Sequence, residues 1–415
     1  MSRLSIVIFG ATGFAGKHAV LQMVKFNKQY PELTWGIAGR SKSKLEVVLQ
    51  DVGRKTGENL NDIRIIIADV DDEQSLKDMC SQAQVIANCC GPYRLYGEPV
   101  VRAAIANNTH HVDITGEPQF IEPMYLKYHT QAQEAGVYVV SACGYDSIPN
   151  DMGVIFLQQN FDGKTLRISS GFTSRLSSRV VSSLVHFSER EKLWRKMFPE
   201  KLPEFKPTLK KRSIVHSNHS RWHLQFPGVD ESIVYRTQRY LHQTCGVRPA
   251  QFHAYVTVRN WCRAIRYIMM VSVVFLMTRF NFFHKILVKY PGAFSLGMVS
   301  REGPPKVLSE NLRFQTMLYE KSHKIKEHSY FSFQYNSFVK LQISGVNPVY
   351  GATVTGLLCS AITILLDTDK MPDRGGVLTT GVAFKDTSLI KRLSDNNFKF
   401  EIVEDTFSNK RNLII

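Results

Sequence analysis

The stretch Gly10-Ala11-Thr12-Gly13-Phe14-Ala15-Gly16 lies directly after the apolar run Leu4–Phe9 and directly before a segment of helical periodicity. The diphosphate of a dinucleotide needs backbone N–H groups that it can approach without an intervening Cβ, and it gains from the positive end of a helix dipole. Gly10 suits the tight turn, Gly13 the close approach and Gly16 the packing of helix against strand. At a first strand–helix junction this pattern predicts nucleotide binding, with a purely structural turn as the alternative.

The first 150 residues repeat the same alternation. Apolar runs of strand length occur at Leu4–Phe9, Thr34–Ala38, Arg64–Ala68, Val85–Cys89, His111–Ile114 and Val137–Ser141. Segments with helical periodicity separate most of them, at Lys17–Phe26, Leu45–Val52, Pro99–Ala106 and Pro123–Ala135. This order predicts an α/β fold with a Rossmann-type, doubly wound parallel sheet, which binds its ligand at the carboxyl ends of the strands.

The pattern changes after Asp151. Tyr255–Val258 and Tyr330–Ile343 read as strands of a mostly antiparallel sheet. We therefore expect a dinucleotide-binding domain over residues 1–150 and a second α+β domain for substrate binding or dimerisation over 151–350. An apolar helix at Leu357–Leu366 and a short strand after Gly375-Gly376 follow. We expect residues 351–415 to return to the first domain.

The net charge of +16 is unevenly distributed. Residues 1–150 contain 14 basic and 16 acidic residues, so the excess lies entirely in the remainder. Between Ser232 and Arg301 there is no Asp or Glu, but there are ten Lys and Arg. Such a stretch points to nucleic acid, an anionic membrane surface or a polyanionic ligand, or is simply a solvated basic face. Nucleic acid is disfavoured because the stretch is too apolar.

The seven cysteines form no C-x-x-C motif and no Cys/His cluster, so neither a disulfide framework nor a metal site is expected. The first apolar run is too short for a secretory signal. We therefore expect a reduced, intracellular setting.

The residues after the second and third strands indicate the cofactor. Arg40, Ser41 and Lys42 stand where an NAD-specific site normally has an acidic residue for the ribose hydroxyls. A cation there can pair with a 2′-phosphate, which favours NADP, while NAD remains the alternative if Arg40 is only solvated. Asp69, at the end of the third strand, could accept a hydrogen bond from the adenine amino group.

Later strand ends supply candidates for the reacting centre. Cys90, Gly91 and Pro92 form the loop after the fourth strand, beside the expected nicotinamide ribose, and Tyr93 could reach the reacting atoms as a proton donor. Three further candidates follow the fifth and sixth strands: Asp113, Cys143 and Tyr145. Packed aromatic residues and helix caps are the alternatives for these positions.

The apolar run Tyr267–Thr278 has cationic residues on both sides, within a segment near 263–290. Twelve residues are too few to span a bilayer, since a helix needs about 20. Apolar length between cations suits a segment that lies in one leaflet of an anionic lipid surface. A buried core helix and a homodimer contact are the alternatives.

The motifs, taken together, resemble those of saccharopine dehydrogenase-like oxidoreductases, in particular the animal branch of that family. The segments that carry the resemblance are Gly10–Gly16, Gly39-Arg40, Asn88–Tyr93, Gly97–Pro99, Asp113–Glu117, Gly144–Pro149, Tyr350–Thr353 and Gly375–Thr379. The resemblance covers essentially the whole chain, and it implies an association with lipid droplets or other membranes. The chain departs from the family pattern at Gly171–Leu176, where members often have Gly-Thr-Trp.

These observations predict an NADP-dependent oxidoreductase that acts on an apolar carbonyl, imine or enoyl substrate at the cytoplasmic face of a lipid droplet or membrane. The alternative is a nucleotide-binding scaffold or ligand carrier on lipid droplets that keeps the fold without turnover.

Overall fold

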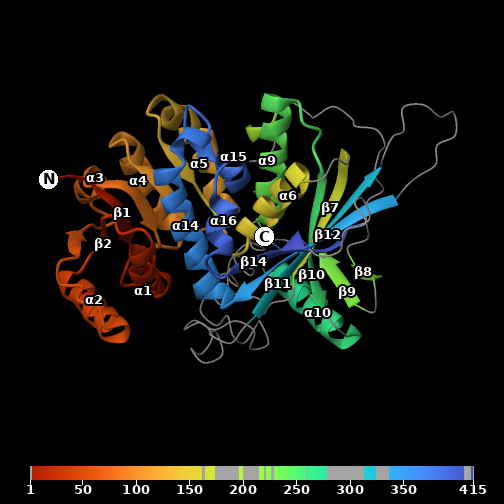
Figure 1. Ribbon diagram of the computed structural model, residues 1–415, viewed down its shortest axis with the longest axis horizontal. Helices are drawn as coiled ribbons and strands as arrows, with labels where there is room; N and C mark the ends of the chain where they lie inside the picture. Colours follow the sequence, from red (N-terminus) through yellow and green to blue (C-terminus); the bar gives the residue numbers. More distant parts are fainter. Residues whose placement is uncertain are drawn as a thin grey trace. The chain divides into compact units, whose positions relative to one another are not determined.

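The computed structural model describes residues 2–160, 164–172, 196–199, 215–218, 221–225, 229–258, 260–277, 313–323, 336–405 and 413–414. The chain forms two compact units (Figure 1). The first contains Met1–Ile148 and Tyr350–Asn397, and the second contains Pro149–Val349 and Phe398–Ile415. The chain thus returns to the first unit after Val349, but from Phe398 onward it belongs to the second unit, whereas the sequence placed all of 351–415 with the first.

The first unit is built on a parallel sheet of seven strands in the order β13-β6-β5-β4-β1-β2-β3. Its strands are β1 (Leu4–Phe9), β2 (Trp35–Gly39), β3 (Arg64–Ile67), β4 (Ala83–Asn88), β5 (His110–Asp113), β6 (Tyr138–Val140) and β13 (Gly376–Leu378). The order reverses between β1 and β4, so the loops after these two strands lie at the switch point where such sheets bind ligands.

Helices cover both faces of this sheet. They are α1 (Phe14–Gln29), α2 (Lys42–Thr56), α3 (Glu73–Ser81), α4 (Tyr93–Ala106), α5 (Pro118–Glu134), α14 (Thr353–Leu366), α15 (Thr380–Phe384) and α16 (Leu389–Ser394), with a π-helix at Pro348–Ala352 and a 3-10 turn at Thr368–Lys370. Helix α1 packs beside α2 and α14, while α3, α4 and α5 pack beside one another. Helix α14, although late in the sequence, therefore packs beside α1 and against β4 and β5.

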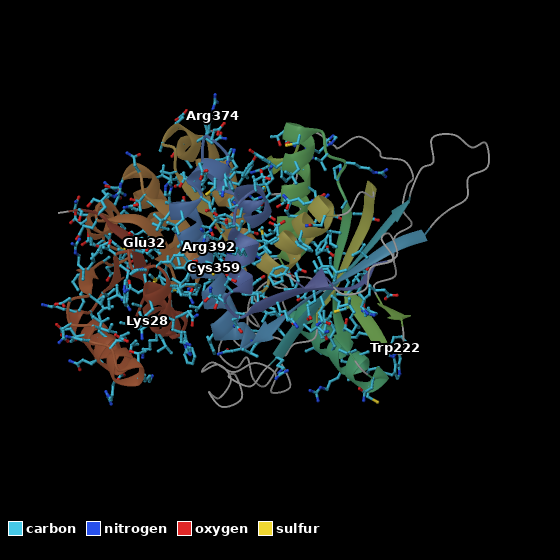
Figure 2. All side chains as sticks on the ribbon, in the orientation of Figure 1. Lys28, Glu32, Trp222, Cys359, Arg374 and Arg392 are labelled. Carbon is cyan, nitrogen blue, oxygen red and sulfur yellow. The ribbon has the colours of Figure 1, made fainter. Side chains whose placement is uncertain are left out.

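Burial explains these assignments. All six residues of β1 are buried, as expected of a central strand covered on both faces. In α14, every residue from Thr353 to Ile364 is buried, so this helix belongs to the core rather than to the surface. Cys359 of α14 lies against α16, where its Sγ donates to the carbonyl of Arg392 at 3.7 Å (both labelled in Figure 2). Helix α3 is the one crossover helix that the periodicity missed, because it is short and mostly polar; its N-cap Asp72 accepts from the N–H groups of Gln74 and Ser75.

The second unit is built on an eight-stranded, mostly antiparallel sheet in the order β15-β14-β12-β11-β7-β10-β9-β8. Its strands are β7 (Lys164–Phe172), β8 (Val215–Asn218), β9 (Arg221–Gln225), β10 (Gln251–Val258), β11 (Arg313–His323), β12 (Asn336–Val346), β14 (Phe398–Asp405) and β15 (Leu413–Ile414). Among the described strands of this sheet, only β7 and β10 pair in parallel. The predicted fold class, a Rossmann-type unit with a second α+β unit, is confirmed. Residues 330–335 of the predicted strand Tyr330–Ile343 lie outside the described residues.

In the described part of the second unit, three helices accompany the sheet: α6 (Ile148–Asn160), α9 (Asp230–Cys245) and α10 (Trp261–Met277). Helix α6 packs closely on β11 and β12, since a Cβ at Gly153 would lie 2.9 Å from the side chain of Ile343. Helices α6 and α9 are joined by paired amide hydrogen bonds between Gln158 and Gln238 at 2.8–2.9 Å. Helix α10 packs against β9 and β10. None of the helices in the described ranges is long and apolar enough to cross a membrane.

Candidate functional site

The glycine-rich loop between β1 and α1 is tightly fitted to its surroundings. Gly10 has a left-handed backbone (φ 76°), and a Cβ there would lie 3.0 Å from the backbone nitrogen of Cys90 in the loop after β4. A Cβ at Gly16 would lie 2.2 Å from the carbonyl oxygen of Gly10, so the helix can approach the loop only with glycine here. Both positions therefore require glycine for the reasons that the sequence suggested.

Gly13 has a different role, because it is the N-cap residue of α1 and has no side chain to cap the first N–H groups of the helix. A Cβ at Gly13 would meet only the carbonyl oxygen of Gly10 within 4 Å, so its other side is open to a ligand. The first turn of α1 contains no acidic residue. An open, uncapped helix N-terminus without nearby negative charge fits a diphosphate.

The ends of β2, β3 and β4 bring three predicted residues into electrostatic contact: Arg40, Asp69 and Cys90. Burial raises the pKa of the Cys90 thiol, the charge of Arg40 opposes this shift, and the charge of Asp69 adds to it. Arg40 is exposed, as a residue that binds a ligand phosphate must be. Ser41 caps α2 by accepting from the N–H of Lys44 at 3.5 Å.

A hollow of about 230 Å³ lies between the first turns of α1 and α2. Its lining combines cationic, hydroxylic and apolar residues, namely Thr12, Lys17, Ser43, Lys44, Val47 and Val48. Sequence reasoning missed Lys17 and Ser43 as site residues. The signal was present in the helical period, because Lys17 follows Gly13 by one turn and its N–H donates to the Gly13 carbonyl at 3.0 Å.

The loop after β4 is held by Asn88. Its side-chain oxygen accepts from the N–H of Cys90 at 2.9 Å, and its carbonyl accepts from the hydroxyl of Tyr93 at 2.8 Å. The Tyr93 ring is buried, with its centroid 5.8 Å from that of Phe120. The peptide bond between Gly91 and Pro92 is cis. The hydroxyl proposed as a proton donor thus makes a hydrogen bond within its own loop.

Glu117, from the loop after β5, caps α4. Its two carboxylate oxygens accept from the N–H groups of Tyr93 and Arg94, each at 3.1 Å. Pro92, the N-cap residue by position, makes no side-chain cap hydrogen bond. A carboxylate from a neighbouring strand end therefore satisfies the helix N-terminus that the sequence left open.

Asp113 links the loops after β5 and β6. Its carboxylate is fully buried and accepts from the N–H of Thr115 at 2.9 Å, the hydroxyl of Ser141 at 2.8 Å and the N–H of Ala142 at 3.1 Å. Burial raises the pKa of Asp113 to about 6, although these hydrogen bonds act in the opposite direction. Burial also lowers the pKa of His111 to about 3, so its ring, 3.8 Å from the Asp113 carboxylate, is neutral at pH 7.

Cys143 and Tyr145 follow β6. Cys143 is fully buried, its thiol donates to the carbonyl of Val140 at 3.3 Å, and burial raises its pKa far above the ordinary value. The N–H of Tyr145 donates to the hydroxyl of Thr353 at 3.4 Å, and the Tyr145 side chain is buried. All four candidates for the reacting centre therefore lie at the carboxyl edge of the sheet, and their catalytic roles stay predictions.

The apolar segment near 263–290 is described as far as residue 277, where it forms most of α10. Ala264 and Tyr267 are buried against the unit, whereas an outward-facing stripe of apolar side chains is 37–63% exposed. The stripe consists of Trp261, Ile265, Ile268, Met269, Val273 and Leu276. Trp222 of β9 (labelled in Figure 2) lies against its first member, with the ring centroids of Trp222 and Trp261 4.7 Å apart. Helix α10 is therefore a surface helix with an exposed apolar stripe, not a buried core helix.

Known proteins are similar to this chain in sequence and in fold. Residues 6–140 match the family described as the saccharopine dehydrogenase NADP-binding domain. A saccharopine dehydrogenase-like oxidoreductase of Rattus norvegicus is 34% identical over 97% of both chains. A lipid droplet localized protein of Caenorhabditis elegans is 34% identical over 97% of this chain and 99% of its own. Saccharopine dehydrogenase (L-Glu forming) of Saccharomyces cerevisiae has the same fold, with a TM-score of 0.55 at 13% identity, over 96% of this chain and 99% of its own.

The glycine cradle, the open N-terminus of α1 and the cationic hollow beside Arg40 all fit the cofactor that this family binds. The chain belongs to the saccharopine dehydrogenase-like oxidoreductases, and it is an oxidoreductase that binds NADP(H).

Proposed function

We propose that this oxidoreductase acts on an apolar carbonyl, imine or enoyl substrate and works at the surface of a lipid droplet or membrane, on its cytoplasmic face. The observation that carries the proposal is the exposed apolar stripe of α10. The name of the Caenorhabditis elegans relative points in the same direction.

The composition of α10 suits a lipid surface better than water. A soluble helix normally turns its apolar side inward, but here apolar residues occupy the outward stripe as well. The helix contains no acidic residue, and Arg266 adds an exposed cation beside the stripe. An apolar stripe with flanking positive charge is the arrangement by which helices lie in the interface of an anionic lipid layer. The Trp222–Trp261 pair adds aromatic rings of the kind enriched at membrane–water interfaces.

The two units divide the work in this proposal. The first unit binds the cofactor, which supplies or accepts a hydride when it is bound. Its glycine loop holds the diphosphate through backbone N–H groups. Arg40, assisted by Lys17 and Lys44, holds the 2′-phosphate. Asp69 accepts a hydrogen bond from the adenine amino group. The second unit provides the lipid contact and the remaining substrate contacts.

Tyr93, Asp113, Cys143 and Tyr145 are proposed to orient the substrate or to move a proton at the carboxyl edge of the sheet. The hydroxyl of Tyr93, the carboxylate of Asp113 and the thiol of Cys143 already make hydrogen bonds within the fold. This observation favours a second candidate function, a nucleotide-binding carrier or scaffold on lipid droplets without turnover.

One experiment separates the two functions. The purified full-length chain is incubated with NADPH together with each chromatographic fraction of a cellular lipid extract in turn. Oxidation of NADPH is followed at 340 nm. The oxidoreductase proposal expects protein-dependent oxidation with one class of fraction and a matching reduced lipid by mass spectrometry. If every fraction leaves NADPH unchanged while lipids from the same extract co-purify with the protein, the carrier function is correct.

A further inference from the structure

The chain re-enters the first unit through a π-helix, Pro348–Ala352, which continues directly into α14. The residue before the π-helix, Asn347, has a left-handed backbone (φ 50°). π-helical turns are rare and are found preferentially at functional sites. Tyr350 is the large aromatic residue of this turn, and it belongs to a sequence motif, Tyr350–Thr353, that the cofactor loop and the strand-end candidates do not explain.

The ring of Tyr350 packs against the start of α1. Its centroid lies 4.6 Å from that of Phe14 and 4.8 Å from that of His18. Phe14 directly follows Gly13, the open N-cap of the diphosphate cradle, and its ring is 46% exposed. An aromatic cluster therefore borders the cradle, and one of its rings remains largely accessible to a ligand.

The start of α14 is also fixed to the loop after β6. The hydroxyl of Thr353 accepts from the N–H of Tyr145, and a Cβ at Gly144 would lie 3.2 Å from the Thr353 methyl group. One turn later, a Cβ at Gly356 would lie 2.7 Å from the carbonyl oxygen of Cys143. Residues 350–353 thus lie between the start of α1 and the loop after β6.

The strand order relates this position to the two halves of a dinucleotide site. The adenosine half belongs beside β2 and α2, because Arg40 directly follows β2 and Ser43 and Lys44 of α2 line the cationic hollow. Across the switch point, the other half extends over β4 and β5. Helix α14 contacts α1, β4 and β5, and its first turn lies against the loop after β6 through Thr353 and Gly356. The start of α14 is therefore on the β4–β5 side of the switch point, whereas Arg40 follows β2.

We propose that Tyr350, together with Phe14, forms an aromatic contact for the nicotinamide half of NADP(H). The adenosine half is held independently by Arg40 and the hollow. Tyr350 is separated from the glycine loop by more than 330 residues of sequence, so no local motif marks it as part of the site.

The test measures binding of two probes to the full-length protein. NADPH, followed by its fluorescence, reports on both halves of the site, whereas 2′,5′-ADP, followed by calorimetry, reports on the adenosine half alone. Tyr350→Leu should weaken NADPH about three- to tenfold, the size of one aromatic stacking contact, and leave 2′,5′-ADP within about twofold. Tyr350→Phe should restore NADPH binding because it keeps the ring. Phe14→Leu, at a half-exposed position, should repeat the Tyr350→Leu pattern.

A matched control is Tyr125→Leu on α5, where another tyrosine ring lies 4.6 Å from a histidine, His129, of the same unit. This variant should bind both probes like the wild type. The proposal is overturned if Tyr350→Leu binds NADPH normally. It is also overturned if NADPH and 2′,5′-ADP weaken equally in Tyr350→Leu, because the ring would then only support the glycine loop.

Discussion

The exposed stripe of α10 makes a quantitative prediction about lipid attachment. Met269 and Leu276 are its most exposed aliphatic members, at 55% and 63%. Together they expose slightly more than the equivalent of one full side chain, and full burial of such a side chain is worth about 1.5–3 kcal/mol. Replacing both by glutamate removes about 2–3 kcal/mol of lipid contact, which corresponds to a loss of affinity of roughly 30- to 150-fold.

The assay is flotation of the full-length protein with triolein droplets coated with phosphatidylcholine and an anionic phospholipid, at a series of lipid concentrations. The control variant carries Leu126→Glu and Leu366→Glu, which make the same charge change at exposed aliphatic positions of the first unit. It should float like the wild type, and both double variants should bind NADPH normally. Repeating the series in about 0.5 M salt suppresses attraction between exposed charges and leaves the apolar contribution.

Two results would refute the reasoning. If the α10 variant floats within about threefold of the wild type, the stripe does not contact lipid. If the control variant loses binding to the same extent, net charge rather than the apolar stripe governs attachment.

Two further predictions concern the first unit. Arg40→Asp should weaken NADPH binding about 10- to 100-fold, since charged hydrogen bonds contribute about 1.5–3 kcal/mol. It should leave NADH binding nearly unchanged. Equal losses of affinity for the two cofactors in fluorescence titrations would exclude a 2′-phosphate contact. Asp367 forms a two-pronged ion pair with Arg392 at 2.7 and 3.1 Å; burial alone would raise the pKa of Asp367, but the hydrogen bonds and charge of Arg392 lower it to about 2. Because the folded pKa is depressed, this stabilisation, about 1–2 kcal/mol after allowance for solvent screening, is present above about pH 4 and is lost as pH falls towards 2. Urea unfolding should therefore show a wild-type advantage over Asp367→Asn at pH 6 that shrinks towards pH 2.5, and a constant difference would contradict the assignment.

The architecture of the first unit was predictable because its signals are local. Each strand of the alternating sheet is a short apolar run, and the glycine spacing at Gly10–Gly16 encodes both a turn and a close approach. The pairing of late segments was not predictable in the same way. β13 joins the parallel sheet beside β6, while β14 pairs with β12 in the second sheet. Such choices depend on contacts between residues far apart in sequence, and no periodicity encodes them.

The cofactor half of the site shows the same division. Arg40 could be identified from its position after β2, because the position alone implies proximity to the ribose. Lys17 could also have been identified, because it follows Gly13 by one helical turn. Tyr350 could not, since its relevance depends on the distant helix, α1, against which its ring packs. The segment Gly171–Leu176 differs from the family pattern, and its residues 173–176 lie outside the described part of the chain.

The acidic residues after the strands show why position alone does not assign chemistry. Asp113 does more than reach the reacting edge, because it accepts from the N–H of Ala142, which has a left-handed backbone (φ 61°), a conformation rare for a residue other than glycine. Loss of activity in Asp113→Ala would therefore not show that Asp113 transfers a proton, since the loop bearing Cys143 and Tyr145 would be released at the same time. Ser141→Ala is the more informative change: it removes one donor to the carboxylate and leaves both backbone hydrogen bonds in place. A shift in the pH dependence of turnover without a loss of NADPH binding would then assign a chemical role to the carboxylate itself.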